Sequence, residues 1–158
     1  MSVDVAKFLP SNYIVNILGY GNNLEKEKLL NKIESMQKMG FVNVKYHGCF
    51  YGKEYQDFID NCQIGLCCRN ISDNESKYAF PSKLLVYLSN NLLTVSTPIK
   101  SVRDSKINKY FYLSKDCQPQ TIASEIVNAV EENEIINNRC LFEKLNKEFV
   151  SAIIKLLN

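Results

Sequence analysis

The sequence predicts an α/β fold, a Rossmann-like parallel sheet flanked by helices. Short apolar runs rich in β-formers alternate along the chain with segments whose apolar residues recur at helical spacing. No tight hairpin signal such as Asn-Gly separates the β-type runs, which favours crossover connections and parallel pairing. With 158 residues, 46% hydrophobic and 23% charged, the chain fits one globular domain over 1–158.

The predicted elements follow one another as strand and helix. The β-type runs cover 13–18, 42–50, 63–68, 92–95 and 110–113, and the helical segments cover 24–39, 53–62, 80–91, 120–132 and 138–157. The third run is almost wholly apolar, which is typical of a buried parallel strand. Asn22 or Asn23 is expected to cap the first long helix. The segment 138–158 is expected to form a C-terminal amphipathic helix with one continuous apolar face.

The composition excludes several classes of function. A net charge of +2 is too small to indicate a nucleic-acid partner. No apolar run approaches the roughly 20 residues of a membrane span, and the first residues lack the pattern of a signal peptide. The six cysteines form no Cys-x-x-Cys pair and there is one histidine, so no metal ion is expected. These features indicate a cytoplasmic protein with reduced thiols.

The segment 80–91 is the stretch around which the chain is organised. It reads Phe-Pro-Ser-Lys-Leu-Leu-Val-Tyr-Leu-Ser-Asn-Asn and follows a polar loop behind the apolar run 63–68. Asn90 and Asn91 are expected to end the helix, since asparagine tolerates the left-handed conformation of a C-terminal stop. A helix that opens after this loop presents unpaired amides and the positive end of its dipole, which is where open α/β sheets hold a phosphate. Lys83 is then either a cation for that phosphate or a solvated surface lysine.

Helical winding separates an apolar face of this segment from a polar one. The residues expected to pack on the sheet are Phe80, Pro81, Leu84, Leu85, Tyr87 and Leu88. Lys83 and Val86 are expected to face a cleft at the carboxyl ends of the strands. Val86 falls in the middle of the polar side. A β-branched apolar residue there is the one departure from the pattern.

Two known site types do not fit the strand ends. Gly19-x-Gly21 resembles the start of a dinucleotide motif, but its third glycine would fall on Leu24, and no acidic residue follows the second strand. A phosphorylated receiver domain needs acidic residues at its strand ends to hold Mg²⁺, and these are absent. His47 precedes Gly48 at a carboxyl strand end, where a ligand role and a structural role remain equally open.

Four segments, in this order and with these gaps, resemble the carboxyl-terminal half of a family 4 (group 1) glycosyltransferase. They are Ile-Val-Asn-Ile-Leu-Gly-Tyr-Gly at 14–21, Val-Lys-Tyr-His-Gly at 44–48, Ile-Gly-Leu at 64–66 and Phe-Pro-Ser-Lys-Leu-Leu-Val-Tyr-Leu at 80–88. Members of that family have the GT-B fold and use nucleotide-activated sugars. The Phe-Pro-Ser-Lys variant is most similar to enzymes that build bacterial capsule and surface polysaccharide.

The resemblance implies roles for several residues. Ser82 and Lys83 would meet the donor diphosphate, and the turn that contains Tyr46, His47 and Gly48 would flank the nucleotide base. The substrates implied are a nucleotide-diphosphate sugar and a glycan or lipid-linked acceptor, with no further cofactor. The implied location is the cytoplasm or the inner face of the membrane.

A first departure from the family concerns its two glutamates. The family carries a Glu-x7-Glu pair that binds the donor sugar and the ribose, and those places fall on Tyr78 and Val86. Losing hydrogen bonds to a charged acceptor costs about 1.5–3 kcal/mol of nucleotide affinity. Asp73 or Glu75 in the adjacent loop is the candidate replacement.

A second departure concerns length. GT-B enzymes have two Rossmann-like domains, and this chain matches one of them, so the amino-terminal domain with the acceptor site is an expected partner. The chain alone is then expected to be inactive, and an exposed face on 138–158 would drive self-association. The alternative interpretation is a degenerate, non-catalytic Rossmann-like interaction or assembly module.

Overall fold

The computed structural model describes residues 2–71 and 79–132, together with 144, 147, 148, 150 and 151. Its elements are α1 Ser2–Val5, β1 Val15–Leu18, α2 Asn23–Lys38, β2 Val44–Gly48, α3 Gly52–Asp60, β3 Ile64–Cys67, α5 Ser82–Ser89, β4 Leu93–Ser96, α6 Lys100–Arg103, the 3₁₀ turn η1 Asn108–Tyr110, β5 Tyr112–Leu113 and α7 Pro119–Glu131. The predicted α/β class is confirmed. The helix expected over 138–158 lies largely outside the described residues.

All described strand pairs are parallel, as predicted, but the strands form two ladders. β1 pairs with β2, and β3, β4 and β5 pair in that order. The sequence pattern had favoured one sheet of five strands. The difference arises because apolar runs predict strands, whereas the pairing of strands distant in the chain depends on packing that no local pattern encodes.

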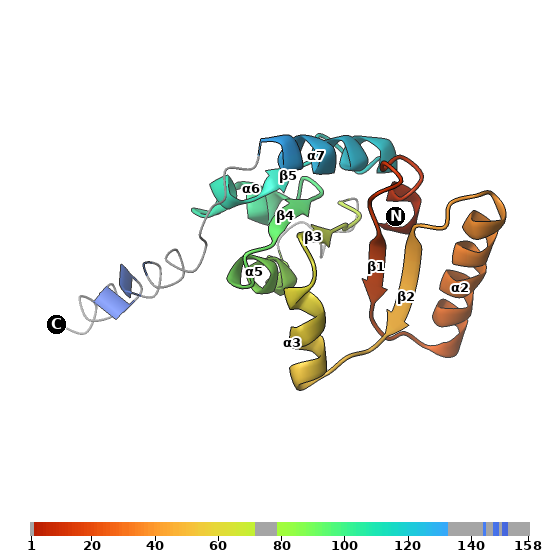
Figure 1. Cartoon of the computed structure of the whole chain (residues 1–158). Helices are drawn as coiled ribbons and strands as arrows, with labels where there is room; N and C mark the ends of the chain where they lie inside the picture. Colours follow the sequence, from red (N-terminus) through yellow and green to blue (C-terminus); the bar gives the residue numbers. More distant parts are fainter. Residues whose placement is uncertain (1, 72–78, 133–143, 145–146, 149, 152–158) are drawn as a thin grey trace.

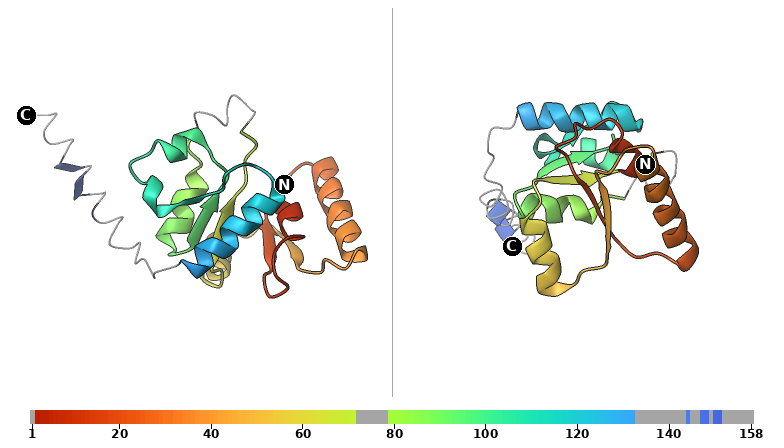
Figure 2. Two further views of the ribbon diagram at one scale, coloured as in Figure 1. Left: turned by 90° about the horizontal axis from the view of Figure 1, so that it is seen from above. Right: turned by 45° about the vertical axis from the view of Figure 1, so that its right-hand side comes forward.

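Helices cover both faces of the β3–β4–β5 ladder (Figure 1). One core lies between the ladder and α7, and a second lies between the ladder and α5 with α6. The fully buried members of these cores include Val95, Ile122, Leu84, Leu88 and Ile99. The right-hand view of Figure 2 shows α7 above the strands and α5 below them. This is the three-layer arrangement of a Rossmann-like fold.

The β1–β2 ladder packs against α2, and α1 links it to the rest of the molecule. Ile33 and Met36 of α2 and Val44 of β2 form a third core with two residues from the amino-terminal segment, Val3 and Ala6. Val5 instead joins the core beneath α7. The α1 helix therefore contributes side chains to both halves.

Two helix ends follow the predicted signals. Asn22 caps α2, because its side chain accepts a hydrogen bond from the Glu25 amide at 2.9 Å while the Glu25 carboxylate accepts one from the Asn22 amide. Asn91 follows α5 with a φ of +58°, the left-handed conformation that asparagine tolerates. Both helices thus begin and end close to the predicted residues.

The packing face of α5 is close to the predicted one. Leu84 and Leu88 are 0% and 1% exposed and lie in the core shared with α6. Leu85 is only half-buried and lies outside the core clusters, so its predicted burial is wrong. Tyr87 lies on the inner face, as predicted, and its ring lies directly on Gly65 of β3.

The half-buried Tyr87 ring makes stability at high pH depend on its hydroxyl. Burial is the main cause that raises the pKa of Tyr87 to about 12 from 10.0. The folded state therefore holds this proton more tightly, and the associated stability is complete below about pH 10 and is lost as the pH rises towards 12. Two pKa units correspond to about 2–3 kcal/mol.

We expect Tyr87→Phe to be less sensitive to this pH range than the wild type. Urea unfolding at several alkaline pH values measures the difference, and ultraviolet absorbance follows phenolate formation. An identical alkaline loss of stability in both proteins would contradict the assignment.

Candidate functional site

The amino end of α5 directly follows the loop behind β3. Pro81 is buried and extended, with φ −73° and ψ 109°, and the helix starts at Ser82. The side chains of Ser82 and Lys83 are both exposed. Their amides have no acceptor within the helix, because the first-turn donors precede the hydrogen-bond pattern, and the N-cap residue Pro81 has no side chain that could cap them. This end of α5 can therefore donate hydrogen bonds to an anion.

The orientation of α5 is fixed by its buried face. Leu84 and Leu88 pack beneath it, and the Tyr87 ring lies on Gly65. Lys83 lies close enough to Cys67, the last residue of β3, to affect it. Burial raises the pKa of the Cys67 thiol, and the charge of Lys83 opposes that shift. Leu84, the residue after Lys83, shares a core with Cys67, so the start of α5 lies near the carboxyl end of β3.

The carboxyl end of the β1–β2 ladder holds the other predicted group. The Tyr46 hydroxyl donates a hydrogen bond to the Gly19 carbonyl at 2.9 Å. His47 Nε2 lies 2.9 Å from Asn16 Oδ1. Gly48 ends β2 with a φ of +75°, which favours glycine, and turns the chain towards α3.

The ring of His47 also packs against two phenylalanines. Its centroid lies 5.0 Å from that of Phe58 in an edge-on arrangement and 6.1 Å from that of Phe50. The Asn16 hydrogen bond occupies one ring nitrogen, and the two phenylalanines give the ring aromatic neighbours, without a ligand. They favour the structural interpretation of His47 over the ligand interpretation.

The two groups of predicted site residues are not joined by any described contact. Among the described residues, no hydrogen bond, ion pair or ring contact connects the Tyr46–His47–Gly48 turn with Ser82 or Lys83. The turn ends the β1–β2 ladder, whereas α5 packs on β3 and β4. In Figure 1 the carboxyl end of β2 lies at the lower edge of the view, and α5 lies beside β3 and β4. The described residues therefore show the two groups on separate elements.

The structure places Val86 outside the core. Its side chain is half-buried and belongs to none of the three core clusters, so Val86 does not lie deep in the core. The Val86 carbonyl accepts hydrogen bonds from the Ser89 hydroxyl and the Asn90 amide. Asp73, Glu75 and Tyr78 lie outside the described residues.

Two exposed tyrosines beside the predicted turn were missed by the sequence reasoning. Tyr20, which follows β1, is 89% exposed, and Tyr51, which precedes α3, is 74% exposed. Both follow the ends of predicted strands, and this position could have marked them as candidate site residues. The sequence did not predict their exposure, because aromatic residues in such runs are more often buried.

Two open cavities lie elsewhere, on the side of α7. One of about 410 Å³ is lined by Asp4, Lys7 and the start of α7, and one of about 460 Å³ is lined by Lys7, Pro10 and the middle of α7. Neither contains a predicted site residue.

Metal ligands, membrane spans and relatives give no further indication of function. In the part of the chain that the structure describes, no three His, Cys, Asp or Glu side chains gather closely enough to hold a metal ion. None of the described helices is both long enough and apolar enough to cross a membrane. No protein-family model matches the chain, and neither does any curated protein.

Proposed function

We propose that this chain is the donor-binding half of a glycosyltransferase that moves a sugar from a nucleotide diphosphate to a glycan or lipid-linked acceptor. The observation that carries the proposal is the amino end of α5. There Ser82 and Lys83 are exposed at the carboxyl end of β3, on a helix held by a buried face. The order of segments that resembles family 4 glycosyltransferases supports it.

The role proposed for the amino end of α5 is electrostatic. In sugar transfer, a bond forms between the acceptor oxygen and the sugar, and the bond from the sugar to the diphosphate breaks. Negative charge develops on the departing diphosphate. Amide donors and the Lys83 ammonium, fixed before the reaction, stabilise that charge without reorganising.

The acceptor would be held by an amino-terminal domain, as in the resembling two-domain enzymes. A lipid-linked acceptor would place the reaction at the inner face of the cytoplasmic membrane. The donor base would lie against the 46–50 turn, so one nucleotide would have to reach both the β1–β2 ladder and α5. That requirement makes the base end and the diphosphate end separately testable.

A second candidate function is a non-catalytic interaction module. It is favoured by Val86, which provides no carboxylate at the position that binds ribose in the family. It is also favoured by the lack of a described contact between the two predicted groups. Such a module would bind nucleotide weakly or not at all.

The Lys83→Ala variant tests the proposal. We expect it to weaken UDP or GDP binding by about tenfold, because it removes one charge-assisted contact. We expect its stability to change by less than about 0.5 kcal/mol, since Lys83 is an exposed residue. Isothermal calorimetry and thermal unfolding measure the two quantities.

Lys26→Ala is the matched control. Lys26 is also an exposed lysine in the first turns of a helix, but Asn22 and Glu25 already cap the amino end of that helix. Equal nucleotide affinity in the wild type, Lys83→Ala and Lys26→Ala would show that Lys83 is solvated surface and would favour the non-catalytic module.

A further inference from the structure

A row of basic side chains lies on the outer surface of α6 and η1. Its members are Lys100, Arg103, Lys106 and Lys109, which stand at every third position and are all exposed. The segment 100–115 holds five lysines and arginines and one acidic residue, whereas the whole chain has 19 basic and 17 acidic residues. The small net charge of the chain therefore conceals one strongly positive surface, the basic row of these four residues.

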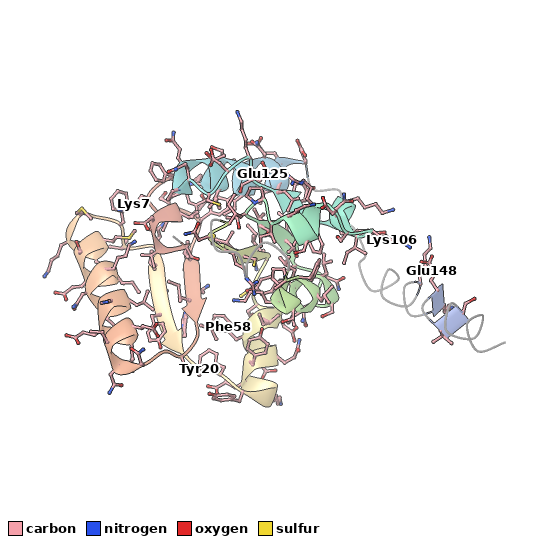
Figure 3. All side chains as sticks on the ribbon, turned by 180° about the vertical axis from the view of Figure 1, so that it is seen from behind. Lys7, Tyr20, Phe58, Lys106, Glu125 and Glu148 are labelled. Carbon is pink, nitrogen blue, oxygen red and sulfur yellow. The ribbon has the colours of Figure 1, made fainter. Side chains whose placement is uncertain are left out.

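The basic row is held at the surface by apolar residues that lie between its members. Ile99 and Val102 are fully buried, and Ile107 and Phe111 pack in the core shared by α5 and α6. With these residues turned inward, the basic residues between them face solvent. Figure 3 shows Lys106 at the outer edge of the molecule.

Two hydrogen bonds fix the turn that joins α6 to η1. The Ser105 hydroxyl donates to the Val102 carbonyl at 2.7 Å, and the Asn108 side chain donates to the Arg103 carbonyl at 2.8 Å. The two halves of the row therefore keep their places relative to one another. A surface whose backbone is fixed in advance loses little conformational entropy on binding.

Most of the positive charge of the row is available to a partner. Asp104 forms ion pairs with Lys100 and with Arg103, the latter at 3.7 Å, and so offsets part of the charge. Within the described residues, neither Lys106 nor Lys109 forms an ion pair. The Lys109 ammonium instead lies 5.2 Å from the centre of the Tyr110 ring.

The row adjoins the amino end of α5. The hydroxyl of Ser101, which lies between two members of the row, donates to the Ala79 carbonyl at 3.2 Å. The rings of Phe80 and Phe111 are 6.2 Å apart between centroids, so the residues before α5 and after η1 are neighbours. A surface that bound the row would therefore lie beside the proposed diphosphate site.

We propose that the basic row binds the surface of a bilayer that contains anionic phospholipids. Clusters of four or more lysines and arginines bind such surfaces, and each residue near the surface strengthens binding by about fivefold. The choice of a lipid surface over other polyanions rests on the proposed function, because a lipid-linked acceptor would be presented there. Binding through the row would hold the amino end of α5 close to that acceptor.

The aromatic residues beside the row do not favour a nucleic-acid partner. Sites for single-stranded nucleic acid add exposed rings, on which bases stack, to a basic surface. Here Phe111 is buried, Tyr110 and Tyr112 are half-buried, and the Tyr110 ring already lies near the Lys109 ammonium. A surface of lipid headgroups needs only the charges of the row.

Phospholipid vesicles, without any sugar or nucleotide, are the probe for the basic row. The full chain is expected to sediment with vesicles of phosphatidylcholine and phosphatidylglycerol but not with vesicles of phosphatidylcholine alone. The double variant Lys106→Gln, Lys109→Gln removes two charges of the row and is expected to weaken binding by about thirtyfold. Added salt is expected to weaken binding of the wild type, because salt screens exposed charges.

The double variant Lys26→Gln, Lys28→Gln is the matched control. These lysines are also exposed but lie on α2, at the other end of the molecule (Figure 1). The two double variants therefore have the same net charge and differ only in where charge is lost. The control is expected to bind anionic vesicles within about twofold of the wild type. Thermal unfolding of both variants checks that each is folded.

Three outcomes overturn the membrane surface. They are no binding of the wild type to anionic vesicles, equal losses in the two double variants, and tighter binding of the row to single-stranded RNA than to vesicles, which would indicate a nucleic-acid partner. If the row binds vesicles while Lys83→Ala leaves UDP and GDP affinity unchanged, the membrane surface stands and the proposed transferase function fails. Nucleotide binding through Lys83 without vesicle binding removes the membrane surface alone.

Discussion

The chain alone is expected to form no detectable glycoside from a nucleotide sugar and an acceptor. Sugar transfer needs both substrates held in near-attack geometry, and that arrangement can supply about 7–11 kcal/mol of the barrier. In the resembling enzymes the acceptor is held by the amino-terminal domain. A chain that binds only the donor would therefore be slower by about five or more orders of magnitude.

The measurement is transfer from labelled UDP- and GDP-sugars, with the chain alone and with the chain fused behind the amino-terminal domain of a resembling enzyme. Donor binding by the chain alone, assayed in parallel, is the control for a folded site. The mass in solution is recorded for each sample, because self-association is also expected. Efficient turnover by the isolated monomer would contradict the half-enzyme account.

The Gly65→Ala variant is expected to lose about 3 kcal/mol of stability, an effect at the upper end for overpacking. A Cβ at Gly65 would lie 2.3 Å from Tyr87 Cγ and 2.6 Å from Tyr87 Cβ, closer than such atoms approach in real proteins. Neither the strand β3 nor the helix α5 can move freely to relieve this contact. β3 is paired with β4 at Gly65–Thr94, and α5 is held by Leu84 and Leu88.

Urea unfolding of Gly65→Ala, compared with Gly21→Ala, measures this effect. A Cβ at Gly21 would meet only the flexible Glu25 side chain, at 3.0 Å and beyond, so that variant is expected to lose less than about 1 kcal/mol. The double variant Gly65→Ala, Tyr87→Ala is expected to lose less than the sum of its parts, because both changes act on one contact. Unchanged stability in Gly65→Ala would show that α5 is not packed on β3 as described.

The strands and long helices could be predicted because each has a local signal. The buried run at 64–67, the cap at Asn22 and the left-handed Asn91 all follow from residues near them in the chain. The division into two ladders could not be predicted, since nothing local specifies the neighbour of β1. α6 and η1, of four and three residues, are too short to show a period.

Part of the candidate site could likewise be predicted from the sequence, and part could not. Helical spacing predicted that Lys83 would face outwards and that Leu84 would be buried, and both are as predicted. Spacing also predicted the inward position of Tyr87, whose ring fits against a glycine, but it failed for Leu85, which is only half-buried. The exposure of Tyr20 and Tyr51 depends on which elements lie above them, which no sequence pattern gives.

The most direct test of the central claim is the map of amide resonance shifts when UDP or GDP is added to the full chain. If the amino end of α5 holds the diphosphate, the largest shifts will fall on the Ser82 and Lys83 amides. A second group of shifts will fall on the 46–50 turn, where the base is expected. A map in which Ser82 and Lys83 do not shift, at nucleotide concentrations that perturb any other part of the chain, would contradict the account.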